Sequence, residues 1–534
     1  MKKRLSFRII ATIVFALLVY YFMLPPINLH AFSFYAYLLI IAIFYLFISI
    51  PDMFSSMAHG FIGSGRIEAD KKFKYIISAI AVVFGLIILI NLILSPLFNA
   101  KSYYNRISIN EDGNFSTDIE EVDFNHIPLL DKDSSQKLGD RVMGEMTDLV
   151  SQFTVSNLYT QINYNNDIVR VTPLEYASII KYFTNRSEGV PAYITVNSVS
   201  GKASLTKLDK GMKYMPSGLF FENLYRKLRI SYPTEIFGSE NFEIDNNGNP
   251  YWIVPTIKYS GVNLKRDVSG VIIFNPITGE SKKYDVKDVP TWVDHVYNAD
   301  LVIEQVNDWG QYENGFLNTL FGQKGVVMTT SGYSYTIMND DVYLYTGITS
   351  VASDESNIGF ILTNMRTKET MFYKISGAEE YSAMASAEGQ VQQMKYKASF
   401  PLLINYNGKP TYLLSLKDNA GLVKMYAFVD VTDYQKVSVT DASSGIEVAA
   451  KNYLGENSLI NQDKLTNSEI TISSIKEGVI DGNTYYYFKD NGDNKYKVSI
   501  KVNNDIIPFL NNGDKVTVSY DNSKDVKEII KLEK

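Results

Sequence analysis

Apolar positions are concentrated near the N-terminus of the chain. Apart from Arg8, no charged residue occurs in three strongly apolar stretches, residues 7–24, 31–50 and 75–98. A helix needs roughly 20 apolar residues to cross about 30 Å of hydrocarbon. Two consecutive prolines, which cannot continue a helix, follow the first stretch. The pattern therefore predicts three transmembrane α-helices, and we do not expect the first to be a cleaved signal peptide, because no small-residue cleavage site precedes the prolines.

Beyond residue 100 the pattern becomes mixed. Runs rich in Val, Ile, Tyr and Thr alternate apolar with polar residues, as half-buried antiparallel strands do. One early helix is expected from Asp133 or Ser134 to about residue 153. A unit of one helix and two strands then recurs four times, with helices around 174–183, 219–228, 292–308 and 378–394. A helix laid on such a sheet shares one core with it, which predicts an α+β ectodomain of repeated helix plus β-hairpin modules.

The last part of the chain predicts a different fold. Residues 465–534 contain five short strand patterns separated by Gly and Asn turns, which fits a small closed β-barrel of OB or SH3-like type. Tyr485, Tyr486, Tyr487 and Phe488 offer stacking surfaces for bases. Consecutive residues of a strand point to opposite faces, however, so at least one of these aromatic rings should pack in the core. The segment is not clearly basic, and we expect no nucleic acid as partner.

These patterns divide the chain into six parts, so the predicted fold class is multi-domain. They are a membrane anchor (1–98), a membrane-proximal segment (99–166), a first pair of modules (167–285), a second pair (286–443), a polar linker (444–464) and the barrel (465–534).

The modules show a resemblance to a known family. In the second module Asn249, Pro250, Tyr251 and Trp252 open a strand, and the next strand ends in VIIFNPITGE at 271–280. This arrangement resembles the PepSY-type module of bacterial extracytoplasmic proteins. The fourth module is similar at 408–412 and 427–430, but Asp433 and Tyr434 replace the Thr-Gly of the motif. The third has Thr367, Lys368 and Glu369 at this place, and the first has Ser200, Gly201 and Lys202. The resemblance implies a non-catalytic role in binding or restraining partners, including proteases.

Charge adds an orientation. The 534 residues carry a formal charge of −7, but residues 1–74 hold eight basic and three acidic residues, a net of +5, which leaves −12 for the rest. Basic residues flank the first span at Lys2, Lys3, Arg4 and Arg8 and lie between the second and third spans at Arg66, Lys71, Lys72 and Lys74. Basic loops stay in the cytoplasm. We therefore expect a multi-pass plasma-membrane protein with a cytoplasmic N-terminus and an extracytoplasmic part after about residue 99.

Composition and motifs exclude several kinds of chemistry. The chain has no cysteine and four histidines without metal-ligand spacing, so we expect no metal and no cofactor. His295 is expected to be a packed or surface residue. Residues 245–249 and 490–493 resemble fragments of calcium loops, but they lack the terminal glutamate and are interpreted as turns. The S-x-x-K sequences at 134–137 and 473–476 lack a K-T-G companion, and no catalytic residue is assigned.

The remaining candidates are aromatic. Trp252, Trp292 and Trp309 would form a binding surface for a partner protein or a glycan if they are exposed, whereas the alternative is that they pack the sheets against their helices. The leading interpretation is a non-catalytic envelope protein that binds or scaffolds protein partners, or its own copies, beside the lipid bilayer. An extracytoplasmic hydrolase of envelope polymer and an accessory subunit of a membrane transport or secretion complex remain open. A cleft with convergent carboxylates would favour the hydrolase.

Overall fold

The computed structural model describes residues 2–60, 68–338, 340–351, 353–457, 466–480, 483–521 and 526–534. The chain forms two compact units. The first unit comprises residues 1–112, 130–354 and 358–373, and the second comprises residues 113–129, 355–357 and 374–534.

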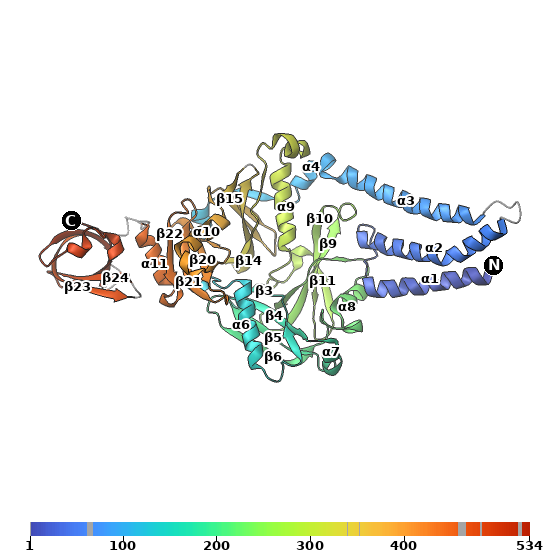
Figure 1. Cartoon of the computed structure of the whole chain (residues 1–534), viewed down its shortest axis with the longest axis horizontal. Coiled ribbons are helices and arrows are strands. Elements are labelled where there is room, and N and C mark those ends of the chain that lie inside the picture. Colours follow the sequence, from blue (N-terminus) through green and yellow to red (C-terminus); the bar gives the residue numbers. More distant parts are fainter. Residues whose placement is uncertain are drawn as a thin grey trace. The chain divides into compact units, whose positions relative to one another are not determined.

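The first unit begins with three long helices, α1 (Lys2–Met23), α2 (Phe32–Gly60) and α3 (Glu68–Leu94) (Figure 1). Each contains a window long and apolar enough to cross a membrane, at Ser6–Met23, Phe32–Ser49 and Tyr75–Leu94. The predicted helices are thus confirmed in length and apolarity. Arg66, one of the basic residues used to predict orientation, lies outside the described residues. A short helix, α4 (Pro96–Tyr104), follows α3 and is kinked at Asn99.

Three antiparallel sheets make up the rest of the first unit. The first runs in the order β2-β4-β5-β6, with β3 also paired to β4. The second has the order β11-β10-β9-β7, with β8 on β9, and the third β1-β16-β15-β14-β12, with β13 on β14. Their strands are β1 (Ile109–Gly113), β2 (Phe153–Val155), β3 (Thr160–Tyr164), β4 (Asp167–Tyr176), β5 (Val190–Asn197), β6 (Ala203–Met212), β7 (Ile236–Phe237), β8 (Asn241–Ile244), β9 (Pro250–Tyr259), β10 (Arg266–Phe274), β11 (Ser281–Tyr284), β12 (Val327–Thr329), β13 (Ser334–Met338), β14 (Asp341–Ser350), β15 (Ser353–Asn364) and β16 (Thr370–Tyr373).

Helices connect and cover these sheets. They are α6 (Lys132–Glu145), α7 (Ile179–Asn185), α8 (Leu224–Ser231) and α9 (Ala299–Tyr312), with short helical turns η2 (Phe220–Glu222), η3 (Val286–Asp288) and η4 (Asn318–Gly322). The early helix is present, but its cap is Asp131 and not Asp133 or Ser134: Asp131 accepts a hydrogen bond from the Ser134 amide. The helix ends at Glu145 and not near 153. The predicted first-module helix around 174–183 is mostly wrong: β4 continues to Tyr176, and only α7 is helical.

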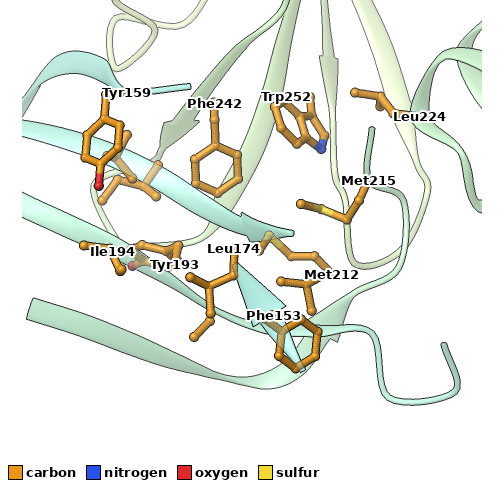
Figure 2. Close-up of a cluster of buried hydrophobic side chains, with 14 of the residues drawn as sticks. Phe153, Tyr159, Leu174, Tyr193, Ile194, Met212, Met215, Leu224, Phe242 and Trp252 are labelled. Carbon is orange, nitrogen blue, oxygen red and sulfur yellow. The ribbon is translucent and has the colours of Figure 1, made fainter. Parts of the chain in front are cut away.

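The long hairpin of β9 and β10 is buried on both faces. Trp252, Val254, Ile272 and Phe274 belong to a core shared with the first sheet (Figure 2). Their neighbours in sequence, which include Ile253, belong to a second core that contains α9 and the third sheet. Burial on both faces explains why these two strands are continuous apolar runs. They differ in this from the half-buried strands, with alternating apolar and polar residues, that the sequence predicts for the ectodomain.

The second unit contains one more sheet, with the order β18-β20-β21-β22 and β19 paired to β20. Its elements are α5 (Phe115–Asp118), η1 (Phe124–His126), β17 (Gly377–Ala378), α10 (Glu380–Gln390), η5 (Gln392–Met394), β18 (Lys397–Ala398), β19 (Leu402–Tyr406), β20 (Lys409–Lys417), β21 (Val423–Asp430), β22 (Val437–Asp441), η6 (Ala442–Ser444) and α11 (Ile446–Glu456). Helix α11 occupies much of the predicted linker. Ala449, Ala450 and Tyr453 on one of its faces are buried, and the Tyr453 ring stacks with that of Phe428 at 5.7 Å.

A closed five-stranded barrel follows, which confirms the predicted architecture. Its strands are β23 (Thr466–Ile480), β24 (Asn483–Asp490), β25 (Lys495–Ser499), β26 (Lys515–Asp521) and β27 (Val526–Glu533), with η8 (Ile500–Val502) and η9 (Ile507–Phe509) between β25 and β26. The order around the barrel is β23-β24-β25-β27-β26, and β25 and β27 are parallel. This Greek-key order is that of the OB type, the first of the two barrel types that the sequence allowed.

Candidate functional site

A polar pocket of about 350 Å³ opens beside the N-terminus of α9. Strands β7, β9 and β10 form one wall, and the start of α9 forms the other. The lining residues are Phe237, Gly238, Ser239, Glu240, Pro255, Ile257, Tyr259, Arg266, Val268, Asn298, Asp300 and Leu301. The lining of the pocket therefore combines apolar side chains with one arginine and two carboxylates.

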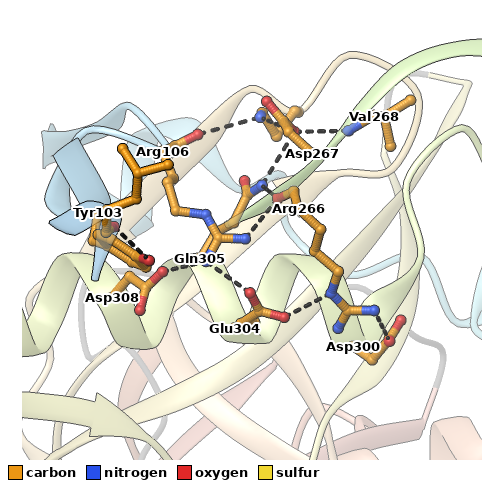
Figure 3. Close-up of polar contacts among 11 residues, drawn as sticks. Tyr103, Arg106, Arg266, Asp267, Val268, Asp300, Glu304, Gln305 and Asp308 are labelled. Carbon is orange, nitrogen blue, oxygen red and sulfur yellow. Dashed lines mark hydrogen bonds and ion pairs between the residues drawn. The ribbon is translucent and has the colours of Figure 1, made fainter. Parts of the chain in front are cut away.

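The arginine is positioned by strand pairing and by α9. Arg266 opens β10 opposite Tyr259 of β9, and its side chain reaches two carboxylates one turn apart on the helix. Its Nη1 lies 2.9 Å from Asp300 Oδ2, and its Nε lies 2.6 Å from Glu304 Oε2 (Figure 3). The guanidinium is about one third exposed, so these ion pairs position the side chain more than they stabilise the fold.

A second arginine lies deeper in the same network (Figure 3). Arg106, which follows α4, is only 4% exposed in its side chain and pairs with Glu304 at 2.7 Å and with Asp308. Its Nη2 also donates to the Arg266 carbonyl oxygen at 2.6 Å. Burial raises the pKa of Asp308 to about 6, although the Arg106 charge opposes the shift. Arg106 thus ties the segment after α3 to α9.

Both carboxylates that line the pocket already have partners. Asp300 is paired with Arg266, and Glu240 accepts a hydrogen bond from the Tyr225 hydroxyl. Burial is the main cause that raises the pKa of Tyr225, and Glu240 adds to it. The pocket can therefore receive a small polar group beside Arg266, but its acids are held in place by neighbours.

A further acidic pair is fully enclosed and does not line this pocket. Glu243 of β8 accepts hydrogen bonds from the backbone amides of Asp294 and His295 at 2.9 and 3.0 Å. The Asp294 carboxylate accepts one from the Asn163 amide at 2.8 Å. Burial raises the pKa of Asp294, and the Glu243 charge adds to the shift. These bonds to backbone groups give the pair a structural role.

His295 is packed in the same region, one of the two situations that the sequence predicted. It is 4% exposed, and its Nε2 lies 2.7 Å from the Gln161 carbonyl oxygen. Burial lowers its pKa to about 4, so the ring stays neutral near pH 7. His295 lies in the irregular segment before α9, which begins only at Ala299, seven residues later than predicted.

The two suspected calcium loops are turns. Asp245 accepts hydrogen bonds from the amides of Asn247 and Asn249, both at 2.9 Å. Asp490 does the same for Gly492 and Asn494, at 2.8 and 2.9 Å. These aspartates thus serve their own turns. Within the described part of the chain, no three acidic or histidine side chains gather as a metal site.

The three tryptophans do not form a common surface. Trp252 is completely buried in the core of Figure 2, and its Nε1 donates to the Tyr214 carbonyl oxygen at 3.1 Å. Trp309 is also buried, and Trp292 is half-buried against Tyr251. The condition for a shared binding surface, exposure of the three rings, is not met by Trp252 or Trp309. The rings pack on the cores of the first unit, as the alternative expects.

The barrel carries a more prominent surface than the tryptophans. On β24, Phe488 is buried and Tyr486 packs beside the barrel core, whereas Tyr485 and Tyr487 have the opposite parity and point outward. Paired residues on β23 and β25 share their face. We call Lys476, Tyr485, Tyr487, Lys489, Lys495 and Lys497 the lysine–tyrosine face. Its members on β24 and β25 stand at every second position, at 485, 487 and 489 and at 495 and 497, and this spacing was the signal for it in the sequence.

Comparison with known proteins gives no family. Neither a family model nor a curated protein matches the chain. Among solved structures, an exo-β-1,3-galactanase from Phanerochaete chrysosporium is 7% identical, with 71% of this chain and 67% of that chain covered and a TM-score of 0.16. An ACO/RPE65 chimera is 8% identical, with 53% and 47% covered and a TM-score of 0.13. Neither likeness carries an argument about fold or function.

Proposed function

We propose that this is a non-catalytic, membrane-anchored protein whose extracytoplasmic part binds a protein partner. The lysine–tyrosine face of the barrel carries this proposal. Tyr487 lies opposite Lys476 on one side and Lys497 on the other, and the Lys497 ammonium lies 4.0 Å from the centre of the Tyr485 ring. Tyrosines and cations together are typical of binding surfaces. Four of the six members are lysines, and of these Lys489 is paired with Asp493 at 2.6 Å. Since the face keeps an excess of positive charge, the proposed partner is an acidic protein segment.

The four sheets support a scaffold role for the rest of the chain. Each has a short strand and a second strand that both pair with the same long strand, followed by two further antiparallel strands. A helix, α6, α8, α9 or α10, precedes each set. We infer four copies of one module, for which the PepSY-type resemblance implies partner binding and no catalysis. The copies begin earlier than the predicted domain boundary at residue 166, which falls between the paired strands β3 and β4.

The charge pattern favours a position of this surface outside the cell. The basic residues that flank the spans favour a cytoplasmic N-terminus, and three crossings lead the remainder of the chain to the other side. A nucleic-acid partner is therefore not proposed, even though an OB-type barrel with half-buried, outward-facing tyrosines is compatible with one.

Site-specific photocrosslinking in cells tests the proposed function. A benzophenone amino acid replaces Tyr487 on the lysine–tyrosine face or, as the matched control, Thr517 on β26, where the paired residues are Glu469 and Glu533. We expect a crosslinked protein from position 487 only, and its loss when Lys476 and Lys497 are changed to glutamate. Equal crosslinking from both positions, or none from 487, contradicts the proposal.

The hydrolase alternative rests on the pocket with Glu240 and Asp300. Most glycoside hydrolases use two carboxyl groups beside the substrate-binding pocket for catalysis. If the alternative holds, the purified full chain cleaves an envelope polysaccharide and Asp300→Asn abolishes the cleavage. We expect no cleavage by either protein, because Arg266 and Tyr225 already engage the two acids.

A further inference from the structure

Exposed apolar side chains gather on one part of the first unit, around α7, η2 and α8. We call them the apolar patch: Ile179, Ile180, Phe183, Phe220, Phe221 and Ile230, which are between 47% and 71% exposed. The rings of Phe183 and Phe220 are 6.2 Å apart, which joins α7 to η2. Single exposed apolar residues are ordinary, but a contiguous group of large ones marks an interaction surface.

Helix α7 is built to present this surface. Only Tyr182 among its residues is buried, and its hydroxyl donates to the Leu219 carbonyl oxygen at 3.1 Å and to Glu222 at 2.7 Å. Ile179, Ile180 and Phe183 point away from the sheet and remain exposed. A helix on the surface of a soluble domain normally turns its apolar face inward. Helix α7 instead exposes most of its large apolar side chains.

The position of α7 in the chain makes it an addition to the module. It lies between β4 and β5, where 13 residues connect the two strands. The equivalent strands of the other three sheets are connected by six, two and five residues, at 260–265, 351–352 and 418–422. Since a tight turn suffices for the fold, the inserted helix serves another purpose.

The apolar patch is continuous with the outer ends of the predicted spans. The Arg226 guanidinium on α8 lies 4.0 Å from the centre of the Tyr21 ring on α1, and its Nη1 donates to the Phe220 carbonyl oxygen at 2.6 Å. Arg229 donates to the Leu24 carbonyl oxygen at 3.0 Å, and the Ile27 amide donates to Pro233 at 2.8 Å. Figure 1 shows α8 beside the end of α1, with α7 nearby.

The turn between β9 and β10 meets the other two spans. Asn91 of α3 donates to the Val262 carbonyl oxygen and accepts from its amide, both at 2.9 Å. The His30 carbonyl oxygen, next to the start of α2, accepts from the Asn263 amide at 2.9 Å. The ends of all three helices are therefore held against this part of the first unit.

A second apolar segment flanks α3. The Tyr103 hydroxyl donates to the Leu94 carbonyl oxygen at the end of α3, and its ring contacts that of Tyr312 with centroids 5.9 Å apart. Residues Leu317, Leu320 and Phe321, just beyond, are 61%, 56% and 83% exposed. Apolar side chains thus occur on both sides of the helix ends.

We propose that the apolar patch and the segment around Phe321 insert into the interfacial region of the bilayer, so that the first unit lies on the membrane surface. This inference rests on the proposed membrane anchoring. We infer that lipid covers both surfaces, because both adjoin residues at the ends of the predicted membrane spans. Interfacial segments of this kind bury a few large apolar residues among headgroups. Lys181 on α7 has a side chain long enough to place its ammonium among the lipid phosphates.

Site-directed spin labelling tests this inference, because the chain has no native cysteine. Single cysteines replace Phe221 in the apolar patch and Ile88 on α3. A third replaces Lys202 in the turn of the β5–β6 hairpin, at the end of that hairpin about 25 Å away from α7. The labelled full chain is reconstituted in phosphatidylcholine and phosphatidylglycerol vesicles. Collisions of the label with oxygen, which partitions into lipid, are compared with collisions with a water-soluble nickel chelate.

We expect the labels at 88 and 221 to favour oxygen and the label at 202 to favour nickel. A lipid-exposed label at 88 with a water-exposed label at 221 overturns the inference and leaves the anchoring intact. A water-exposed label at 88 overturns the anchoring itself. A label at 221 shielded from both reagents, with spin–spin broadening, shows that a second copy covers the patch and also overturns the inference.

Discussion

Replacement of Arg106 by methionine should loosen α9 and its attachment to the segment after α3. The change keeps most of the aliphatic volume but removes a guanidinium that is 4% exposed and that pairs with Asp308 and Glu304. Breaking a buried ion pair on one side typically costs about 3–5 kcal/mol, because the remaining charge is left without a partner. Asp308 is 15% and Glu304 38% exposed, so water compensates part of the loss. We expect a cost of about 2–4 kcal/mol.

The cost should depend on pH in a defined direction. The pKa of Asp308 is already raised to about 6 with Arg106 present, and it rises further without the arginine. A carboxyl whose pKa is higher in the folded than in the unfolded state destabilises the fold as pH increases through the interval between the two values. The Arg106→Met protein should therefore be closer to wild type at pH 5 than at pH 8, where Asp308 must ionise without a partner.

Hydrogen exchange of the α9 amides in the full chain, in lipid nanodiscs, measures this local stability without assuming that the whole chain unfolds in one step. The matched control is Arg106→Met with Asp308→Leu, which leaves no buried unpaired charge and should recover most of the protection. Unchanged α9 exchange in the single variant, or a double variant as unprotected as the single one, refutes the assigned role of Arg106.

Two further predictions concern the cores. Gly279 has a φ of +77°, and a Cβ there would lie 2.5 Å from the Tyr214 ring. Gly279→Val should therefore lower the free energy of unfolding of the first unit by about 1–3 kcal/mol, measured by thermal unfolding. An unchanged midpoint would contradict the requirement for glycine in this turn. Burial and the Glu243 charge raise the pKa of Asp294, so the stability of the wild-type protein should fall as pH rises above the ordinary pKa of an aspartate. In Asp294→Asn the dependence of stability on pH should be weaker. The same pH dependence in both proteins would contradict the raised pKa of Asp294.

Sequence patterns were sufficient to predict the elements whose structure is set by residues close together in the chain. Charge-free stretches of about 20 residues predicted the three long helices, because a spanning helix needs apolar residues around its whole circumference. The parity of residues 485–488 predicted that the aromatic rings would divide between the two faces of β24. The barrel followed from turn residues at regular spacing.

Long-range burial explains the failures. Val293 and Val296 have helix-like spacing, but the segment that contains them is irregular, because the amides of Asp294 and His295 bind Glu243, a residue about 50 positions earlier. The continuous apolar run around Trp252 is consistent with a strand covered on both faces, but it does not show which elements cover it. The core shared by the first and second sheets decides this, and a single sequence does not show which sheets pack together. Conversely, the polar composition of 444–464 concealed α11, whose small buried residues pack on its own sheet.

The candidate site was less predictable than the fold. The pocket gathers Glu240 from the loop between β7 and β8, Arg266 from β10 and Asp300 from α9, and no sequence motif links these positions. Arg106, Glu304 and Asp308 likewise meet only after folding. The lysine–tyrosine face was within reach of the sequence, since its members alternate along adjacent strands.

The sidedness of the barrel is the most direct test of the central claim that the binding part lies outside the cell. Because the chain lacks cysteine, Asn512→Cys in the barrel and Ser6→Cys at the start of the first span each provide one site for a membrane-impermeant maleimide. In intact cells we expect labelling at position 512 and none at position 6 until the membrane is permeabilised. Labelling at position 6 with protection at position 512 would contradict the account.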